Sequence, residues 1–383
     1  MPAPAPPPAD DLRDPSWDRA LGVPTGATAA TALVGADTSL AARFLAPAPS
    51  PPARLAALAG AALDHRPPPG EDPLDRAWVG AVRTLVRTGA PPERSPDLEH
   101  APADDPRGVS WRALTRTPVP RHAPDRGAFA CAHLVDAVWT SYTSAGDLAA
   151  MYTGALAGAR WGLSAVPLQA QRAMAGTADP HALLAATFAL VRGHRPDRWP
   201  HATVLADEPR RLPPFAVPHP LDPDVLLGNI DHLRARPETF DAAVSLCRTH
   251  PTDAPGLPRA DWVRVWLHDD PGRNPNLHFA LDEAAAAVAA LRAEGKRVLL
   301  HCWAGASRTP AVAARYAAAG LGAPVLPSLT LLIRTVGGHL DNPSLARAVA
   351  RLSGQDLADP AAALFPGGTP PRRADLPDPR ITG

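Results

Sequence analysis

The feature that most constrains this chain is the run from residue 298 to 310, which reads Val-Leu-Leu-His-Cys-Trp-Ala-Gly-Ala-Ser-Arg-Thr-Pro. Its first three residues are apolar, which predicts the end of a buried strand. A short loop containing Gly305 follows, and Pro310 is expected to open a helix. A strand, a glycine-containing loop and a helix in this order predict a cradle for an oxyanion.

The residue types of this loop suit attack on a bound phosphate. Backbone N–H groups between Cys302 and Arg308 can turn inward, and the positive end of the following helix points to the same place. Arg308 supplies a planar, permanently charged fork for two phosphate oxygens. Together these groups favour the ionised thiolate of Cys302, the predicted nucleophile. Thr309 is predicted to hydrogen-bond the sulfur, and His301 to order the loop rather than transfer protons.

The pattern His-Cys-x5-Arg-Thr resembles the signature of the cysteine-dependent protein tyrosine and dual-specificity phosphatases. The resemblance covers about residues 214–354 and implies an α/β domain whose central mixed, largely parallel sheet is flanked by helices. It implies no metal ion and no cofactor. The alternative, a strand cysteine followed by an accidental arginine, leaves the order of strand, loop and helix unexplained. The residues that the resemblance assigns to phosphate binding are Trp303, Ala304, Gly305, Ala306, Ser307 and Arg308.

The mechanism of the resembled family also needs a general acid, an aspartate on a loop upstream of the cysteine. Asp269 and Asp270 both qualify. Val265, Leu267 and Asp269 alternate along one side of the preceding predicted strand, so Asp269 continues its buried face towards the catalytic end. This alternation favours Asp269, while Asp270 stays open as the alternative.

The remaining positions of the loop bear on the substrate. Trp303, Ala304, Ala306 and Ser307 include no lysine, whereas inositide-directed relatives usually carry basic residues there. A phosphoprotein or another monophosphate ester is therefore favoured over a polyphosphoinositide. Trp303 is placed to stack on a phosphotyrosine ring, or else it faces outward or packs in the core.

A weaker resemblance lies in the first half of the chain. Residues 144–167, within a region of about 100–190, resemble the carboxy-terminal part of the ADP-ribosylglycohydrolases, where paired aspartates bind magnesium before a small-residue helix. Here Asp147 is present, but Ala145 stands where the second aspartate is expected, and one carboxylate is a poor magnesium site. The segment is predicted to be a degenerate remnant without a metal. An ordinary helix packed closely through glycines and alanines fits equally well.

Composition frames the domain organisation. The 383 residues are enough for two domains, and the 49 prolines gather in stretches that are predicted to be flexible. The expected parts are a Pro/Ala-rich, largely flexible segment (1–74), a helical region (75–193), a linker (194–213), the phosphatase domain (214–355) and a flexible tail (356–383).

Charge and cysteine content limit the expected partners. The formal net charge is zero, which gives no electrostatic reason to expect nucleic acid or a membrane surface as partner. The three cysteines lack metal-ligand spacing, and neither a signal segment nor a membrane-spanning run is evident. A cytoplasmic protein is expected, where a thiolate stays reduced. The sequence specifies no oligomeric state.

The predicted function is hydrolysis of phosphomonoesters, in proteins or small molecules, through a phosphocysteine. One alternative is a pseudophosphatase that binds phosphate or serves as a scaffold without efficient turnover. Another is ADP-ribosylglycohydrolase-type chemistry in the first half of the chain.

Overall fold

The computed structural model describes residues 14–37, 39–46, 49–177, 179–192, 212–270 and 272–376. The chain divides into two compact units: unit 1 comprises residues 1–120 and 130–205, and unit 2 comprises residues 121–129 and 206–383. The predicted linker, residues 194–213, lies outside the described residues except for its last two.

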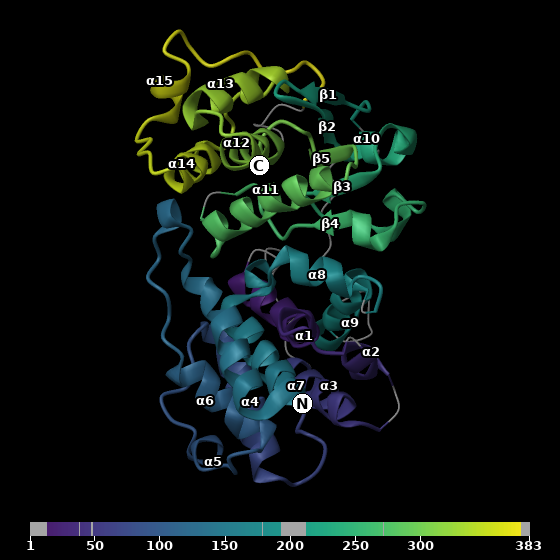
Figure 1. Ribbon diagram of the computed structural model, residues 1–383, viewed down its shortest axis with the longest axis vertical. Helices are drawn as coiled ribbons and strands as arrows, with labels where there is room; N and C mark the ends of the chain where they lie inside the picture. Colours follow the sequence, from purple (N-terminus) through teal and green to yellow (C-terminus); the bar gives the residue numbers. More distant parts are fainter. Residues whose placement is uncertain are drawn as a thin grey trace, which may run out of the picture. The chain divides into compact units, whose positions relative to one another are not determined.

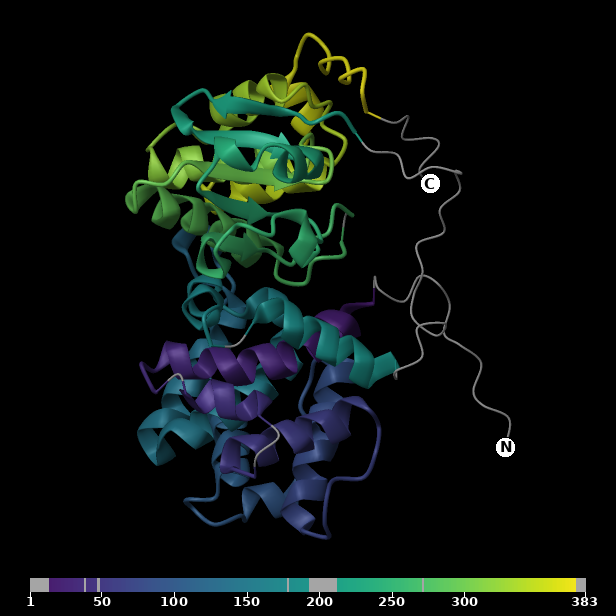
Figure 2. The same cartoon turned by 90° about the vertical axis from the view of Figure 1, so that its right-hand side faces the viewer.

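The described part of unit 1 is helical (Figures 1 and 2). Its helices are α1 (Pro15–Leu33), α2 (Ser39–Leu45), α3 (Pro51–Leu63), α4 (Pro73–Thr88), α5 (Pro96–Glu99), α6 (Pro106–Arg116), α7 (His133–Trp161), α8 (Leu168–Met174) and α9 (Pro180–Arg192). Short 3-10 turns lie at Ala130–Ala132 and Leu163–Ala165.

Helices α1 and α7 pack with their backbones almost in contact. A Cβ atom added to Gly158 would lie 1.9 Å from the carbonyl oxygen of Gly22, and one added to Gly154 would lie 2.2 Å from that of Gly26. Because no side chain fits between the two backbones, these glycines are fixed by close packing. The small residues of α7 therefore have a structural explanation.

The prediction that residues 1–74 are largely flexible is wrong for the described part of that segment. Three helices form there, and the fourth begins at Pro73. Pro15, Pro51, Pro52 and Pro73 lie in the first turn of helices, where the missing N–H costs nothing. The preceding Asp14, Ser50 and Asp72 accept the capping hydrogen bonds.

Unit 2 contains a mixed five-stranded sheet flanked by helices, in agreement with the predicted α/β class. Its strands are β1 (Ala216–His219), β2 (Asp222–Asn229), β3 (Ala242–Ser245), β4 (Trp262–Arg264) and β5 (Val298–Cys302). The order across the sheet is β1-β2-β5-β3-β4. Only the β1–β2 pair is antiparallel. Strand β5 is therefore central and delivers its last residue at the carboxyl edge of the parallel strands.

Helices surround this sheet in the described part of unit 2. They are α10 (Ile230–Ala235), α11 (Leu277–Ala293), α12 (Arg308–Gly320), α13 (Val325–Thr335), α14 (Pro343–Leu352) and α15 (Pro360–Leu364), with 3-10 turns at Pro237–Thr239, Pro251–Asp253 and Arg259–Asp261. Leu233 of α10 packs with Leu299 of β5 and Trp262 of β4 in a buried cluster. Helices α11 and α12 contact each other and β5 (Figure 1).

A segment from the first half of the chain belongs to unit 2. Residues 121–129 pack on α11, where the rings of His122 and His278 lie 5.2 Å apart and those of Phe129 and Phe279 lie 5.5 Å apart. The 3-10 turn Pro124–Arg126 contacts α14. The predicted single region 75–193 is therefore interrupted, because nine of its residues pack with the later unit.

The tail after residue 355 also differs from the prediction of flexibility. Helix α15 forms within it, and Arg347 of α14 donates to the carbonyl of Ala358 at 3.1 Å. Further along the tail, Arg373 donates to the carbonyl of Ala304, as described below. Residues 377–383 lie outside the described residues.

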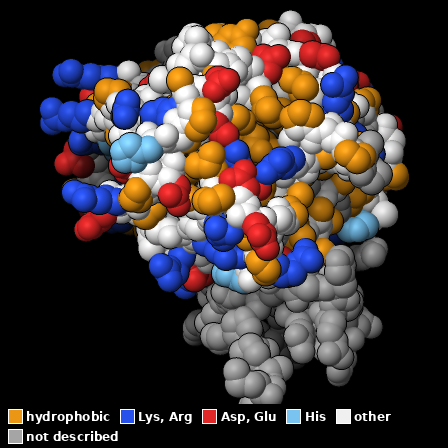
Figure 3. Space-filling model, turned by 90° about the horizontal axis from the view of Figure 1, so that it is seen from below, with side chains coloured by type: hydrophobic (Ala, Val, Ile, Leu, Met, Phe, Trp, Pro, Cys, Tyr) orange, Lys and Arg blue, Asp and Glu red, His pale blue; other side chains and the backbone are white. Residues whose placement is uncertain are grey.

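The described helices include none that is both long and apolar enough to cross a bilayer. Figure 3 shows positive and negative side chains interspersed with hydrophobic ones on one face of the molecule. The expectation about nucleic-acid and membrane partners stays a prediction.

Candidate active site

The predicted cradle lies between β5 and α12. Cys302 is the last residue of β5, where it pairs with Asn229 of β2. Residues 303–307 form the loop, called the catalytic loop below, and α12 begins at Arg308, two residues earlier than Pro310 was expected to open it. The positive end of this helix of 13 residues thus borders the loop.

Gly305 brings a backbone donor to the nucleophile. Its N–H donates to the sulfur of Cys302 at 3.2 Å, and its φ of +76° lies in the left-handed region. A Cβ atom there would lie 2.7 Å from the carbonyl oxygen of Gly228. Both the turn and the close approach to β2 therefore require glycine.

Arg308 is anchored by backbone carbonyls through Nη1 and faces Asp269 through Nε. Its Nη1 donates to the carbonyls of Leu246 at 2.6 Å and Leu267 at 3.1 Å, while its buried Nε has no hydrogen-bond partner. Burial lowers the pKa of Arg308, but the negative charges of Cys302 and Asp269 outweigh burial and raise it. Arg308 thus carries its charge beside the sulfur, where it favours a bound oxyanion.

Asp269 lies against the catalytic loop. Ser307 Oγ donates to Asp269 Oδ1 at 2.7 Å, and Arg308 Nε lies 3.4 Å from Asp269 Oδ2. Asp270 is half-buried and follows on the same loop, where its carbonyl accepts from Arg273 N at 3.4 Å. The contacts favour Asp269 over Asp270 as the acid, and the choice stays a prediction. The alternation argument for Asp269 is not met, because β4 ends at Arg264 and Asp269 is exposed instead of continuing a buried face.

Two asparagines that the sequence did not assign to the site hold the segment around Asp269. Asn274 bridges the loop back to His268, accepting from its N–H at 2.8 Å and donating to its carbonyl at 3.0 Å. Asn342 donates to Asp269 Oδ1 at 3.2 Å. In the sequence Asn342 precedes Pro343 and resembles a helix cap, yet its side chain makes no capping bond to α14. Only the long-range contact reveals its role.

His301 is a buried, neutral support for the strand end. Complete burial lowers its pKa to about 4. Trp262 Nε1 donates to Ser245 Oγ at 2.9 Å, and Ser245 Oγ lies 2.6 Å from His301 Nε2. Because indole is only a donor, the Ser245 hydroxyl proton is available for Nε2, which leaves Nδ1–H facing the Cys302 carbonyl at 3.4 Å. This arrangement agrees with an ordering role.

Thr309 does not make the contact that was predicted for it. It is buried, and its Oγ1 donates to the carbonyl of Gly228 at 3.5 Å instead of to the Cys302 sulfur. The hydroxyl of Thr309, in the first turn of α12, thus reaches the Gly228 carbonyl of β2. The predicted role of Thr309 in phosphocysteine hydrolysis has no support from this contact.

The other loop residues lie around the cradle. Trp303 is 41% exposed, so of the placements considered it takes an outward one, and its carbonyl accepts from Ile230 N at 3.4 Å. Ala306 is buried. The carbonyl of Ala304 accepts from Arg373 Nη2 at 2.8 Å, a contact with the tail that the sequence did not suggest.

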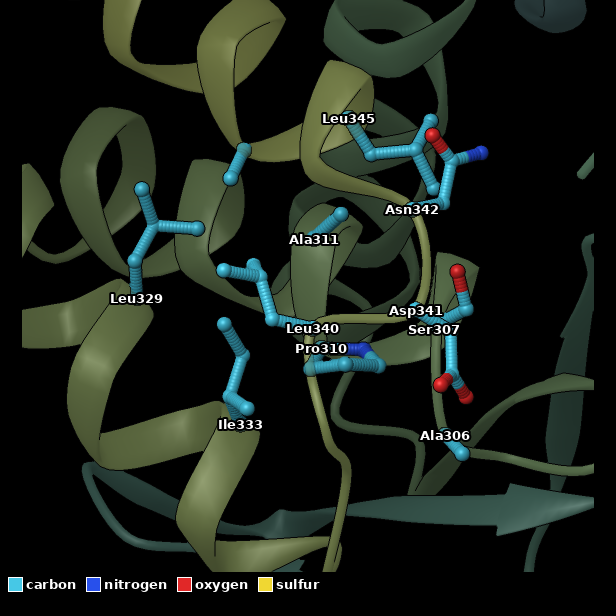
Figure 4. A pocket seen from close by; sticks show the side chains of 11 residues that line it. Ala306, Ser307, Pro310, Ala311, Leu329, Ile333, Leu340, Asp341, Asn342 and Leu345 are labelled. Carbon is cyan, nitrogen blue, oxygen red and sulfur yellow. The ribbon is translucent and has the colours of Figure 1, made fainter. Parts of the chain in front are cut away.

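A small pocket adjoins the catalytic loop (Figure 4). Its enclosed volume of about 20 Å³ has room for a water molecule or two and lies far below the range typical of small-molecule sites. Apolar side chains, including Leu329, Ile333 and Leu340, line one side, and Ser307 and Asn342 line the other.

The segment that resembles ADP-ribosylglycohydrolases lies in α7 of unit 1. The helix is interrupted at Ala145 and Gly146, and Asp147 follows the break. Among the residues that the structure describes, no three His, Cys, Asp or Glu side chains are grouped so that they could hold a metal ion. Asp147 therefore has no companion ligands there.

The chain matches no protein-family profile and no curated protein. Among solved structures, a crystal structure of the PTP-2 phosphatase of Cydia pomonella aligns with 36% of this chain and 88% of that chain, at 21% sequence identity and a TM-score of 0.31. A likeness this weak does not establish the activity. The functional inference rests on the residues of the site itself.

Proposed function

We propose that unit 2 hydrolyses phosphomonoesters through a phosphocysteine intermediate. The observation that carries this proposal is the convergence of three groups on one spot: the Cys302 sulfur, the Gly305 N–H that donates to it, and the charged Arg308 guanidinium. Such a set binds a dianion and keeps its charge stabilised while the bond to phosphorus changes.

In the proposed first step, the Cys302 thiolate attacks phosphorus. The P–S bond forms, the bond to the ester oxygen breaks, and the leaving oxygen takes a proton from Asp269. In the second step, water attacks phosphorus while Asp269 takes its proton, the P–S bond breaks, and inorganic phosphate and the thiolate result. Ser307 and Asn342 hold Asp269 at the loop throughout.

The proposed substrates are monophosphate esters, with phosphorylated proteins as the main class. The catalytic loop carries no lysine for additional phosphates. Trp303 at the rim offers an aromatic face.

The test is hydrolysis of an aryl phosphate in the presence of a chelator. The parent chain should turn over, and Cys302→Ser should lose at least about 10³-fold in kcat, because a serine hydroxyl is not ionised here. Arg308→Lys should lose about 10²-fold or more in kcat/KM, because a point charge cannot replace the fork.

The alternatives give different results in the same assay. A pseudophosphatase would bind phosphate or tungstate through Arg308 yet leave the aryl phosphate intact. Magnesium-stimulated release of ADP-ribose that survives Cys302→Ser would place a hydrolase in unit 1. Phosphatase activity that survives Cys302→Ser would refute the proposed nucleophile.

A further inference from the structure

The tail of the chain reaches the catalytic loop through one arginine. Arg373 lies in the described tail, nine residues after α15. Its guanidinium stacks over Phe215 with its carbon 3.6 Å from the ring centroid. Its Nη1 donates to the carbonyl of Val336 at 2.8 Å, and its backbone N–H donates to the carbonyl of Gly337 at 3.2 Å. The side chain is only 15% exposed, so it is built into the structure.

The remaining Nη2 of Arg373 donates to the carbonyl of Ala304 at 2.8 Å. That carbonyl belongs to the same planar peptide unit as the N–H of Gly305. The two groups of a trans peptide point in opposite directions, and this N–H donates to the Cys302 sulfur at 3.2 Å. One peptide plane therefore connects the guanidinium on one side with the nucleophile on the other.

We propose that Arg373 is a positioning residue for the nucleophile: it fixes and polarises the Ala304–Gly305 peptide so that its N–H stabilises the Cys302 thiolate. A charged donor on the carbonyl strengthens the N–H of the same peptide as a donor, because hydrogen bonds in a chain polarise one another. The inference rests on the proposed function, since it assigns a support to the same nucleophile.

The titratable groups near the Cys302 sulfur would not obscure a shift in the pH dependence of its alkylation. Burial raises the pKa of Cys247 to about 12 and lowers that of His301 to about 4, so neither changes charge between pH 5 and 9. Arg308 keeps its charge throughout. The further charged or titratable groups that act on this cluster are Asp269, Asp253, Arg234, Arg248, His232 and His268, and they are the same in the parent chain and in each variant. Asp375 accepts from Nε of Arg373 at 2.5 Å.

The test compares Arg373→Met, Arg373→Lys and a matched control, Arg372→Met, in the full chain. Methionine keeps an apolar stem over Phe215 but removes the charge and the donors. Arg372 precedes Arg373 in the chain, and it pairs with Asp341 at 3.0 Å. The first readout is the pH profile of alkylation of Cys302 by iodoacetamide, located by peptide mass spectrometry. The second is kcat and KM on an aryl phosphate.

In Arg373→Met the alkylation midpoint should move to higher pH by about 0.5–1 unit, and kcat/KM at pH 6 should fall about three- to tenfold. Arg373→Lys should recover part of both changes, and Arg372→Met should move neither. The inference fails if Arg373→Met leaves the profile unchanged, if Arg372→Met shifts it equally, or if lysine does no better than methionine.

Alkylation needs no turnover, which separates this inference from the proposed function. A shifted profile in a chain that hydrolyses no phosphate would support the role of Arg373 and refute the phosphatase proposal. An unshifted profile in an active phosphatase would do the reverse.

Discussion

The catalytic loop and the α1–α7 helix pair both depend on glycine, for different reasons. Gly305 allows a positive φ and a close approach to β2, and its own N–H donates to the sulfur of Cys302, three positions earlier. Gly158 has no such local task. It is required because the backbone of Gly22, far earlier in the chain, occupies the space of its Cβ.

This difference decides what a short window of sequence reveals. The cysteine, glycine and arginine of the loop lie between positions 302 and 308, so their spacing alone predicts the chemistry, although it does not predict the approach of Gly305 to Gly228. In unit 1 the explanation for a glycine lies on another helix. A stretch of small residues is then equally compatible with close packing, with a remnant of an active site and with a flexible segment.

The sharpest test of the helix pair is Gly158→Ala, with Gly80→Ala in α4 as control. The new methyl group at position 158 would meet a backbone oxygen at 1.9 Å, whereas the one at position 80 meets nothing within 4 Å. We expect the first to cost about 3 kcal/mol or more, because backbone cannot move aside. The second should stabilise by about 0.5–1 kcal/mol through helix propensity.

Urea unfolding followed by circular dichroism measures both changes. Equal stabilities for the two variants would show that α1 and α7 are not in backbone contact. The comparison with the catalytic loop would then lose its basis.

The next largest effect is expected at the acid. Asp269→Asn should lower kcat about 100-fold on an alkyl or unactivated aryl phosphate, because the leaving oxygen then departs without a proton. On an ester with a good leaving group the loss should be much smaller. The leaving-group dependence of kcat across a series of aryl phosphates gives the measurement.

Asp270→Asn is the matched variant for this test. It removes a neighbouring carboxylate from the same loop and should leave the leaving-group dependence unchanged. If Asp270→Asn steepens that dependence and Asp269→Asn does not, the contacts of Asp269 with Ser307 and Arg308 serve structure only.

A smaller effect is expected at Asp18 in α1, which accepts hydrogen bonds from Ser164 N and Oγ at 2.8 and 2.5 Å. Burial raises the pKa of this carboxyl from 3.8 to about 6. The folded state therefore holds the proton more tightly than the unfolded chain. Its contribution to stability is full below about pH 4 and is lost as the pH rises to about 6.

Asp18→Asn, which carries no charge, should therefore stabilise unit 1 at pH 8 by about 1–2 kcal/mol and have little effect at pH 4. Unfolding free energies at the two pH values give the result. If the stabilisation were the same at both pH values, the cost of burying the charged Asp18 carboxylate would not be its cause.

The sequence was sufficient for the strand, loop and helix around Cys302, because alternation and spacing are local signals. It was insufficient for the supports of the site. Asn342 and Arg373 lie 40 and 71 positions after Cys302, and nothing beside them in the sequence indicates what they contact. Their roles come from tertiary contacts, which no periodicity encodes.

Proline content misled the prediction for the first 74 residues for a related reason. Composition counts prolines without regard to position, whereas a proline after a capping Asp or Ser starts a helix. The dipeptides Asp14-Pro15 and Asp72-Pro73 contain that signal. A count over the whole segment does not separate it from the signal for disorder.

The docking of residues 121–129 on unit 2 has a consequence for the order of synthesis. Phe129 leaves the ribosome 150 residues before its ring partner Phe279. At typical elongation rates this delay is on the order of 10 s, far longer than local helix formation takes. Residues 121–129 must therefore remain undocked on the growing chain until α11 has been made. Unit 2 can complete its packing only at that point, although this part of it was synthesised much earlier.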